Sequence, residues 1–147
     1  MKIFIIVSIM IISYLVGTYI IKTSKVHLET LKDVVNLIEC LKIHINYSSA
    51  KIYEIINEFT KKCKTPLKNM INNKSNGVLY QNEYIDLEKL LSSLGKSDLS
   101  GQNLLLEKYK LIFDKYIFEA VERHAVLTKT TIKLTIAVGV LICLLIL

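Results

Sequence analysis

Apolar residues of this chain are gathered in an uninterrupted run near its start. Ile3 to Ile21 include no charged side chain, and Lys2 and Lys22 flank them. At ~1.5 Å per residue the run would form a helix of about 28 Å, close to the ~30 Å hydrocarbon core of a bilayer. A cleaved signal peptide has a shorter apolar region and a small-x-small cleavage site, and the sequence offers no convincing site of that kind. The pattern predicts a retained transmembrane anchor over residues 1–22.

A second apolar run, Leu134 to Leu147, is short for a crossing. A helix that starts at Thr130 reaches about 27 Å, with Lys133 extending to the headgroups. We therefore predict a C-terminal transmembrane helix over residues 130–147 and a polar domain over residues 23–129. Each predicted span also has two small residues four positions apart, which permits close helix packing: Ser13 with Gly17, and Thr135 with Gly139.

Between the predicted spans, apolar residues recur every three or four positions, which is typical of amphipathic helices. Alternating runs typical of β-strands are lacking. The sequence predicts an all-α fold, a helical bundle between the two transmembrane helices. The four stripes are Leu28, Leu31, Val35, Ile38, Leu41 and Ile45; Ile52, Ile55, Ile56, Phe59 and Cys63; Ile85, Leu87, Leu90, Leu91 and Leu94; and Leu105, Tyr109, Ile112, Tyr116 and Ala120, with Phe113 and Ile117 alongside.

Cap and break residues set the expected helix ends. Pro66 should end the second helix, and residues 72–77, Asn-Asn-Lys-Ser-Asn-Gly, should form a polar loop. The third helix is expected over residues 83–94, with Gly95 in a left-handed conformation after it. Residues 103–132 hold no break residue, so the fourth helix should continue into the apolar tail. Candidate N-caps are Ser48 or Ser49 for the second helix and Ser97, Asp98 or Ser100 for the fourth.

Positive charge is concentrated beside the predicted spans. The chain has 19 Lys and Arg against 13 Asp and Glu, and every base except Lys2 lies between residues 22 and 133. The positive-inside rule then places the polar domain in the cytoplasm and both termini across the membrane. A basic balance can also indicate nucleic-acid binding, but bases beside membrane spans are typical of a cytoplasmic face, and we expect no nucleic-acid partner. Cys40 and Cys63 would lie in a reducing compartment, so no disulfide is expected.

The sequence predicts neither a catalytic site nor a cofactor or metal site. Gly95-Lys96-Ser97 resembles the end of a phosphate-binding loop, but Leu90 occupies the position of the required first glycine. His44 and Cys40 make an isolated two-ligand pair on a helix, too few for a metal centre. Because no nucleophile has an identifiable base and orienting group, we expect a protein that is not an enzyme.

Three segments carry a resemblance to a known family. Leu94-Gly95-Lys96-Ser97-Asp98, followed by Gln102, resembles the LG-x-SD-x-x-x-Q element of the stage III sporulation protein AB family. Residues 41–47, ending in Tyr47, are similar to the end of that family's first helix, and the tail from Gly139 is similar to its closing aliphatic run. The chain departs from the family where Lys51-Ile52 replace Pro-Leu, where Lys25 replaces an arginine, where Thr135 replaces a glycine, and in a shorter stretch near residues 64–82.

The resemblance implies a membrane platform subunit of a secretion-like channel between mother cell and forespore. Such proteins are similar to the platform proteins of type II secretion and type IV pilus machines, whose cytoplasmic helical domains meet a secretion ATPase. The implied partners are that ATPase, other membrane subunits of the channel and the lipid bilayer, and self-association into a homo-oligomer is left open. The implied location is the mother-cell membrane around the forespore. Candidate structural or partner-contact residues are Gly95, Ser97, Asp98, Gln102, Tyr47 and Gly139.

Two other functions are open on the sequence alone. One is a membrane-tethered helical adaptor or regulator unrelated to sporulation. The other is a small pore, which the lack of an ionisable residue inside either predicted span disfavours.

Overall fold

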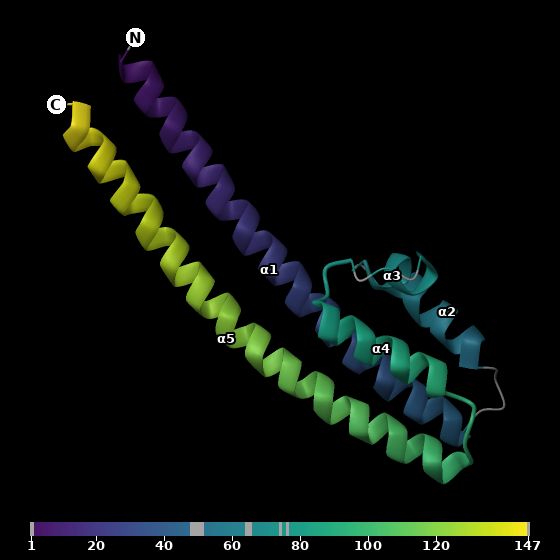
Figure 1. The fold of residues 1–147 in the computed structure, drawn as a ribbon. Coiled ribbons are helices and arrows are strands. Elements are labelled where there is room, and N and C mark those ends of the chain that lie inside the picture. The colour runs from purple at the N-terminus through teal and green to yellow at the C-terminus, as the bar shows by residue number, and fades with distance from the viewer. Residues whose placement is uncertain (1, 48–51, 64–65, 74, 76, 147) are drawn as a thin grey trace. The chain divides into compact units, whose positions relative to one another are not determined.

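The computed structural model describes residues 2–47, 52–63, 66–73, 75 and 77–146, and every regular element within these ranges is an α-helix. Figure 1 shows the helices coloured along the chain. They are α1 (Lys2–Tyr47), α2 (Ile52–Lys62), α3 (Leu67–Asn73), α4 (Gln81–Ser93) and α5 (Leu99–Ile146). The predicted all-α fold is confirmed. The candidate caps Ser48 and Ser49 lie outside the described residues.

Helix α3 was not predicted, and it corrects the expected loop over residues 72–77. Asn72 and Asn73 belong to the last turn of α3, and the turn that follows begins at Gly77 among the described residues. Pro66 does separate α2 from the following chain as predicted, but it also lies directly before α3, and its carbonyl accepts the Met70 N–H at 3.0 Å. Burial of Leu67 and Met70, one turn apart on the same side, stabilises this seven-residue helix.

The chain folds as two compact units, which we describe separately. The first combines Met1–Lys25 with Ala120–Leu147, and the second is Val26–Glu119. In the first unit the start of α1 and the end of α5 lie side by side (Figure 1). Gly17 is buried there, and a Cβ on it would lie 2.8 Å from Thr131 Cγ2 and 3.5 Å from Thr135 Oγ1. The small residues of the two predicted spans thus meet at Gly17 and Thr135, while the surroundings of Gly139 lie outside the described residues.

When only the described residues are counted, no helix is long and apolar enough to cross a membrane. Many side chains of the predicted spans fall outside that set, so the two spans stay predictions. These side chains belong to Ile3, Ile5, Ile6, Ile9, Ile132, Ile136, Gly139, Val140 and residues 143–147.

The core of the second unit is built around α1. Four residues of its predicted stripe are buried, and two of them, Ile38 and Leu41, are at most 1% exposed. Val34 and Leu37, which the stripe did not include, are fully buried as well. On α5 the predicted stripe is confirmed in part, at Tyr109 and at Phe113 beside it. The buried face is formed by Leu106, Tyr109 and Phe113, whereas Leu105 and Ile112 are only half-buried.

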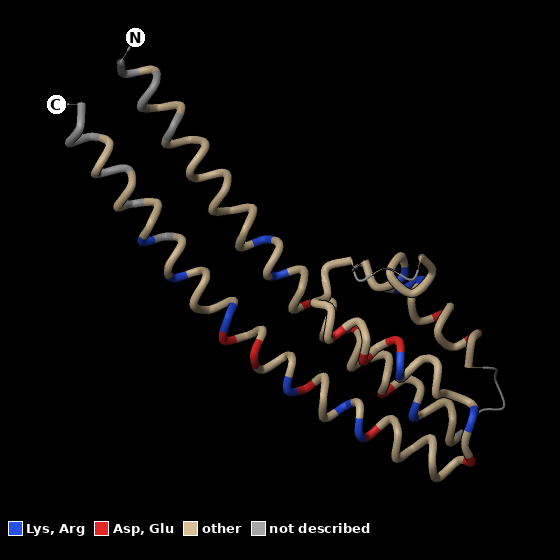
Figure 2. Tube along the Cα trace, in the orientation of Figure 1, with Lys and Arg blue, Asp and Glu red and all other residues tan. Residues whose placement is uncertain are grey.

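Polar pairs fix the register of α1 against α5 within the second unit. Lys42 Nζ contacts Glu107 Oε1 at 2.6 Å, Lys110 Nζ contacts Glu39 Oε1 at 2.6 Å, and the amides of Asn46 and Asn103 bond each other. Residue numbers fall by four and then three along α1 while they rise by four and then three along α5. This is the spacing of two antiparallel helices in constant register. Figure 2 shows the charged residues along both helices.

Candidate functional site

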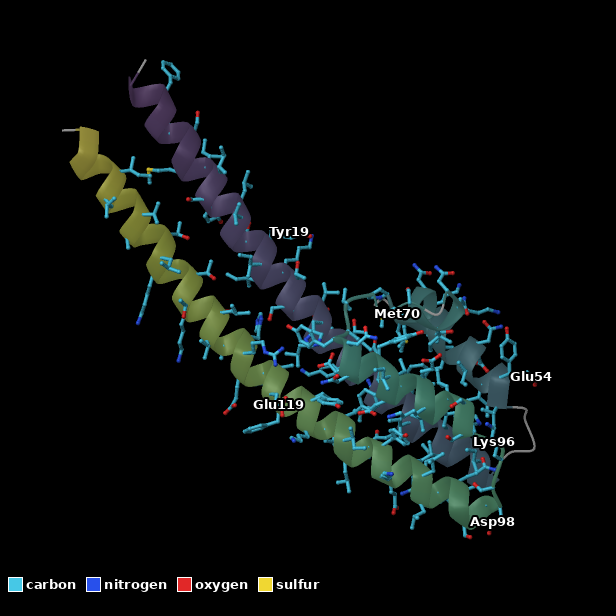
Figure 3. The ribbon with its side chains drawn as sticks, viewed as in Figure 1. Tyr19, Glu54, Met70, Lys96, Asp98 and Glu119 are labelled. Carbon is cyan, nitrogen blue, oxygen red and sulfur yellow. The ribbon has the colours of Figure 1, made fainter. Side chains whose placement is uncertain are left out.

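The predicted site residues Gly95, Ser97, Asp98 and Gln102 come together at the corner between α4 and α5. The corner begins where Leu94 N–H donates to Leu90 O at 3.2 Å and closes the last turn of α4. Gly95 follows with φ +77°, a left-handed conformation that L side chains rarely adopt. The predicted role of this glycine is confirmed. Figure 3 labels Lys96 and Asp98 in this corner.

Asp98 is the N-cap of α5, one of the three predicted candidates. Its Oδ1 accepts the Gly101 N–H at 3.1 Å and its Oδ2 accepts the Ser100 hydroxyl at 2.6 Å. These two donors, the Ser100 hydroxyl first, hold the pKa of the Asp98 carboxyl below its usual value. A Cβ on Gly101 would lie 2.8 Å from Asp98 Oδ1, so the small residue makes room for the cap.

Gln102 ties the first turn of α5 back to the turn before it. Its Nε2 donates to the Ser97 carbonyl at 2.9 Å, and its N–H donates to the Asp98 carbonyl at 2.9 Å. Its Oε1 is buried with no hydrogen-bond partner among the described residues. All four residues therefore shape the corner through bonds within it. Two other candidates were predicted. Tyr47 is the last residue of α1 and Gly139 lies within α5, and the surroundings of both fall outside the described set.

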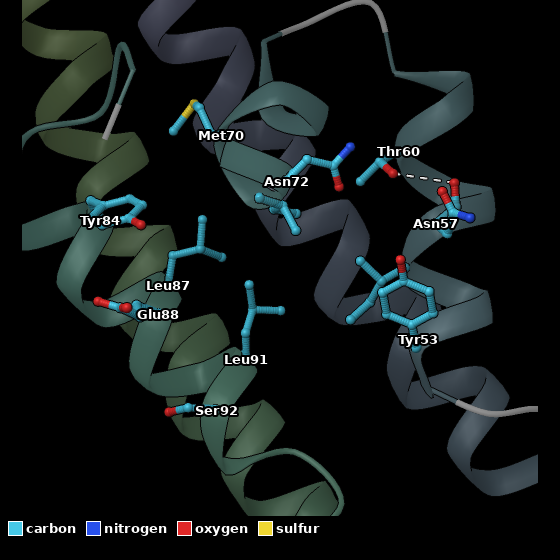
Figure 4. A pocket seen from close by; sticks show the side chains of 12 residues that line it. Tyr53, Asn57, Thr60, Met70, Asn72, Tyr84, Leu87, Glu88, Leu91 and Ser92 are labelled. Carbon is cyan, nitrogen blue, oxygen red and sulfur yellow. Dashed lines mark hydrogen bonds between the residues drawn. The ribbon is translucent and has the colours of Figure 1, made fainter. Parts of the chain in front are cut away.

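A groove of about 350 Å³ opens between α2, α3 and α4, close to this corner (Figure 4). Its apolar lining includes Tyr53, Met70, Leu87 and Leu91, and its polar lining groups are amides, hydroxyls and a carboxylate. Gly95 of the corner lies against the start of α2, since a Cβ on it would lie 3.5 Å from Ile52 Cδ1. The full set of lining residues is Tyr53, Ile56, Asn57, Thr60, Met70, Ile71, Asn72, Tyr84, Leu87, Glu88, Leu91 and Ser92.

Sequence reasoning missed this groove because α3 contributes to its lining. Gly77, with φ +53°, returns the chain from α3 toward α4, and a Cβ on it would lie 2.6 Å from Met70 Cγ. The left-handed turn thus brings backbone directly against a groove residue. The Asn-Gly pair at 76–77 was the one available signal, although Asn76 lies outside the described residues.

A buried polar pair holds the start of α4 on α1. Glu83 Oε2 accepts hydrogen bonds from His27 Nε2 and from the Tyr80 N–H, each at 2.8 Å. The His27 ring also meets the Tyr80 ring edge-on, with centroids 4.7 Å apart. Farther along α4, the Tyr116 hydroxyl donates to Asp86 Oδ2 at 2.8 Å, and burial together with this carboxylate raises the pKa of Tyr116 to about 12. These contacts set the position of α4, one wall of the groove.

The chemistry that corner and groove offer is binding. A partly open apolar surface with amide and hydroxyl groups suits an apolar or amphipathic segment of another protein. The corner fixes where α5 starts relative to α4 and so shapes one end of that surface.

Comparison with family models matches residues 2–83 to stage III sporulation protein AB. Searches of curated proteins and of solved structures gave no match. The matched residues comprise α1, α2, α3 and the start of α4, and they stop before the corner whose LG-x-SD-x-x-x-Q element carries the resemblance seen in the sequence. Because the match covers more than half of the chain, the protein belongs to the stage III sporulation protein AB family.

Proposed function

We propose that this protein is a non-enzymatic membrane platform of the sporulation channel, whose second unit docks a cytoplasmic secretion ATPase and other channel subunits. The family assignment supports a role in sporulation. The observation that carries the platform role is the separation of the chain into an apolar pair of helix ends and a charged helical unit with an open groove.

The first unit supports membrane anchoring because its described apolar side chains are exposed on both helices. Phe4, Ile12 and Leu15 on α1 are exposed, as are Leu134 and Leu141 on α5. A surface of this kind is covered in proteins by lipid or by another apolar surface. Apart from Lys2, the charged residues of α1 begin at Lys22 and those of α5 end at Lys133, as expected for two spans that enter from the cytoplasm.

The groove supports docking because it combines apolar area with accessible anchors. The Tyr53 side chain is 75% exposed at its edge, and tyrosine supplies large contact area at low entropic cost. An amphipathic segment of the ATPase would lay its apolar face against Leu91 and Tyr53, with Glu88 and Asn57 at its polar border.

Two experiments test the proposal. Deleting the gene from its spore-forming host should abolish heat-resistant spores and arrest forespores after engulfment, and the intact gene should restore them. Normal spore counts would refute the sporulation role.

Tyr53→Ala with Leu91→Ser should reduce co-purification of the ATPase with the full chain, whereas Ile43→Ser, a change at an exposed apolar residue of α1, should not. Equal ATPase recovery from both variants would refute docking at the groove.

A further inference from the structure

Helix α5 carries a row of apolar residues that stay exposed among the described residues of the second unit. Leu104, Leu111 and Phe118 are 73%, 72% and 63% exposed. They are seven residues apart, so at 100° per residue they form one line that drifts by only ~20° per step. Leu106, Tyr109 and Phe113 lie on the opposite side of the same helix and are buried in the core. We call Leu104, Leu111 and Phe118 the α5 seam.

Charges of opposite sign flank the α5 seam on its two sides. Glu107 and Asp114 follow Leu104 and Leu111 by three residues, which puts them on one side of the line. Lys108 and Lys115 follow by four, which puts them on the other side. All four side chains are exposed, although Glu107 also contacts Lys42 and Lys115 lies 3.9 Å from Glu119. Beside Leu104 and Leu111 the seam therefore has one acidic and one basic border, whereas beside Phe118 Glu122 lies on the basic side.

We propose that the α5 seam is a homodimer interface in which two copies of this chain pair their α5 helices in parallel. Two-stranded coiled coils have two apolar positions per heptad, and the α5 seam supplies one of them, so two copies would meet along a narrow apolar line with the charged borders close on either side. In a parallel pair, each border faces the opposite border of the partner, so Lys108 and Lys115 meet the partner's acidic side. In an antiparallel pair, each border faces its own counterpart and like charges oppose each other. Charge complementarity thus selects a second copy in parallel orientation.

Membrane anchoring, as proposed above, requires the same orientation. Two copies inserted in one bilayer with the same topology are related by an axis along the membrane normal, which keeps equivalent helices parallel. Confinement to the membrane also raises the local concentration of the partner, so a seam of three apolar residues suffices for association. This second argument rests on the proposed function, whereas the seam and its borders do not. The groove between α2, α3 and α4 is formed without α5, so dimerisation leaves it open.

Site-specific cross-linking of the full chain in liposomes tests the orientation. In a background with Cys40, Cys63 and Cys143 replaced by serine, Leu104→Cys should form a disulfide between two identical copies, because parallel pairing brings residue 104 against its own counterpart. In an antiparallel pair, residue 104 meets residue 118, so only a mixture of Leu104→Cys and Phe118→Cys chains would cross-link. Ile43→Cys, exposed on α1 outside the seam, is the matched control and should not cross-link. Cross-linking only in the mixture, or equal cross-linking of Ile43→Cys, would overturn the proposal.

Charge reversal tests the borders. Lys108→Glu/Lys115→Glu makes both borders acidic, and Glu107→Lys/Asp114→Lys makes both basic, so we expect each variant alone to lose Leu104→Cys cross-linking by about fivefold or more. Mixing the two variants should restore it, because every facing pair of borders is then opposite in sign. Lys61→Glu/Lys68→Glu, on α2 and α3, changes the net charge as much as Lys108→Glu/Lys115→Glu does. It should have no effect on Leu104→Cys cross-linking. Failure of the mixture to recover while both variants keep their circular dichroism would refute charge-directed pairing. ATPase recovery is read separately, so loss of groove docking and loss of the dimer are distinguishable.

Discussion

Replacing Glu83 tests how α4 is held on α1. Its Oε2 accepts hydrogen bonds from both His27 Nε2 and the Tyr80 N–H, and Glu83 and His27 are only 5% and 6% exposed. Glu83→Ala leaves the buried His27 Nε2 and the part-buried Tyr80 N–H without an acceptor, at about 1–3 kcal/mol for the first and about 1 kcal/mol for the second. We expect the free energy that keeps α4 closed to fall by about 3 kcal/mol. Since 1.4 kcal/mol is a factor of ten, α4 should open about 100 times more often.

Hydrogen–deuterium exchange of the full chain in micelles measures this opening directly, through the amides of α4. Glu83→Gln keeps an acceptor oxygen at the same place and loses only the charge, so its effect should be much smaller than that of Glu83→Ala. Glu88→Ala, an exposed residue of the same helix, should change exchange little. If Glu83→Ala and Glu88→Ala exchange equally, the buried pair does not hold α4 and the reasoning is wrong.

Three further changes probe the corner, the first unit and a thiol. Asp98→Ala should lower the melting temperature by about 3–8 °C, whereas Asp98→Asn should lower it much less. The pKa of Asp98 is lowered on folding, so its charge stabilises the fold only while the carboxyl is ionised. The difference in stability between wild type and Asp98→Asn should therefore vanish as the pH falls well below about 4. Gly17→Ala should destabilise the helix pair of the first unit by about 1–3 kcal/mol in micelle unfolding, and adding Thr131→Ala should restore stability because it removes the Cγ2 atom 2.8 Å away; no rescue would contradict that contact. Burial and Asp33 raise the pKa of Cys63 to about 11, so iodoacetamide should modify Cys63 slowly at pH 8 and faster in Asp33→Asn; an unchanged rate would refute the influence of Asp33.

Local chemistry made part of the fold predictable. The position of Gly95 after α4 and the cap by Asp98 depend only on residues within a few positions. Gly95 was predicted correctly, and Asp98 was one of three predicted cap candidates. The continuous α5 followed from the lack of a break residue, and the close approach at Gly17 agrees with the small-residue pairs in the two runs. In each case the neighbours that decide the structure are near in sequence or repeat with the helix.

Contacts between distant residues were not predictable in this way. His27 and Glu83 are 56 positions apart, and each alone looks like an ordinary helix-surface residue in the sequence. The seven residues of α3 are too few to show a periodic stripe, and the helix is fixed by burial of Leu67 and Met70 against other parts of the unit. The groove depends on α3, so it escaped prediction for the same reason. The α5 stripe was predicted only in part, because α5 has apolar residues on several sides and only packing decides which of them are buried.

The sequence had assigned both structural support and partner contact to the residues of the corner. The structure favours support by the corner and partner contact at the groove. Both carboxylate oxygens of Asp98 are bonded within the corner, and the Gln102 amide nitrogen is bonded to Ser97. Groups that are committed to their own turn have little left to offer a partner, so Asp98→Ala with Gln102→Ala should weaken ATPase recovery only as far as it lowers the melting temperature. Variants at the exposed Tyr53 should do the reverse, with recovery lost and the melting temperature kept. If the corner variants instead lose recovery at an unchanged melting temperature, the corner contacts the partner directly and capping is not its main role.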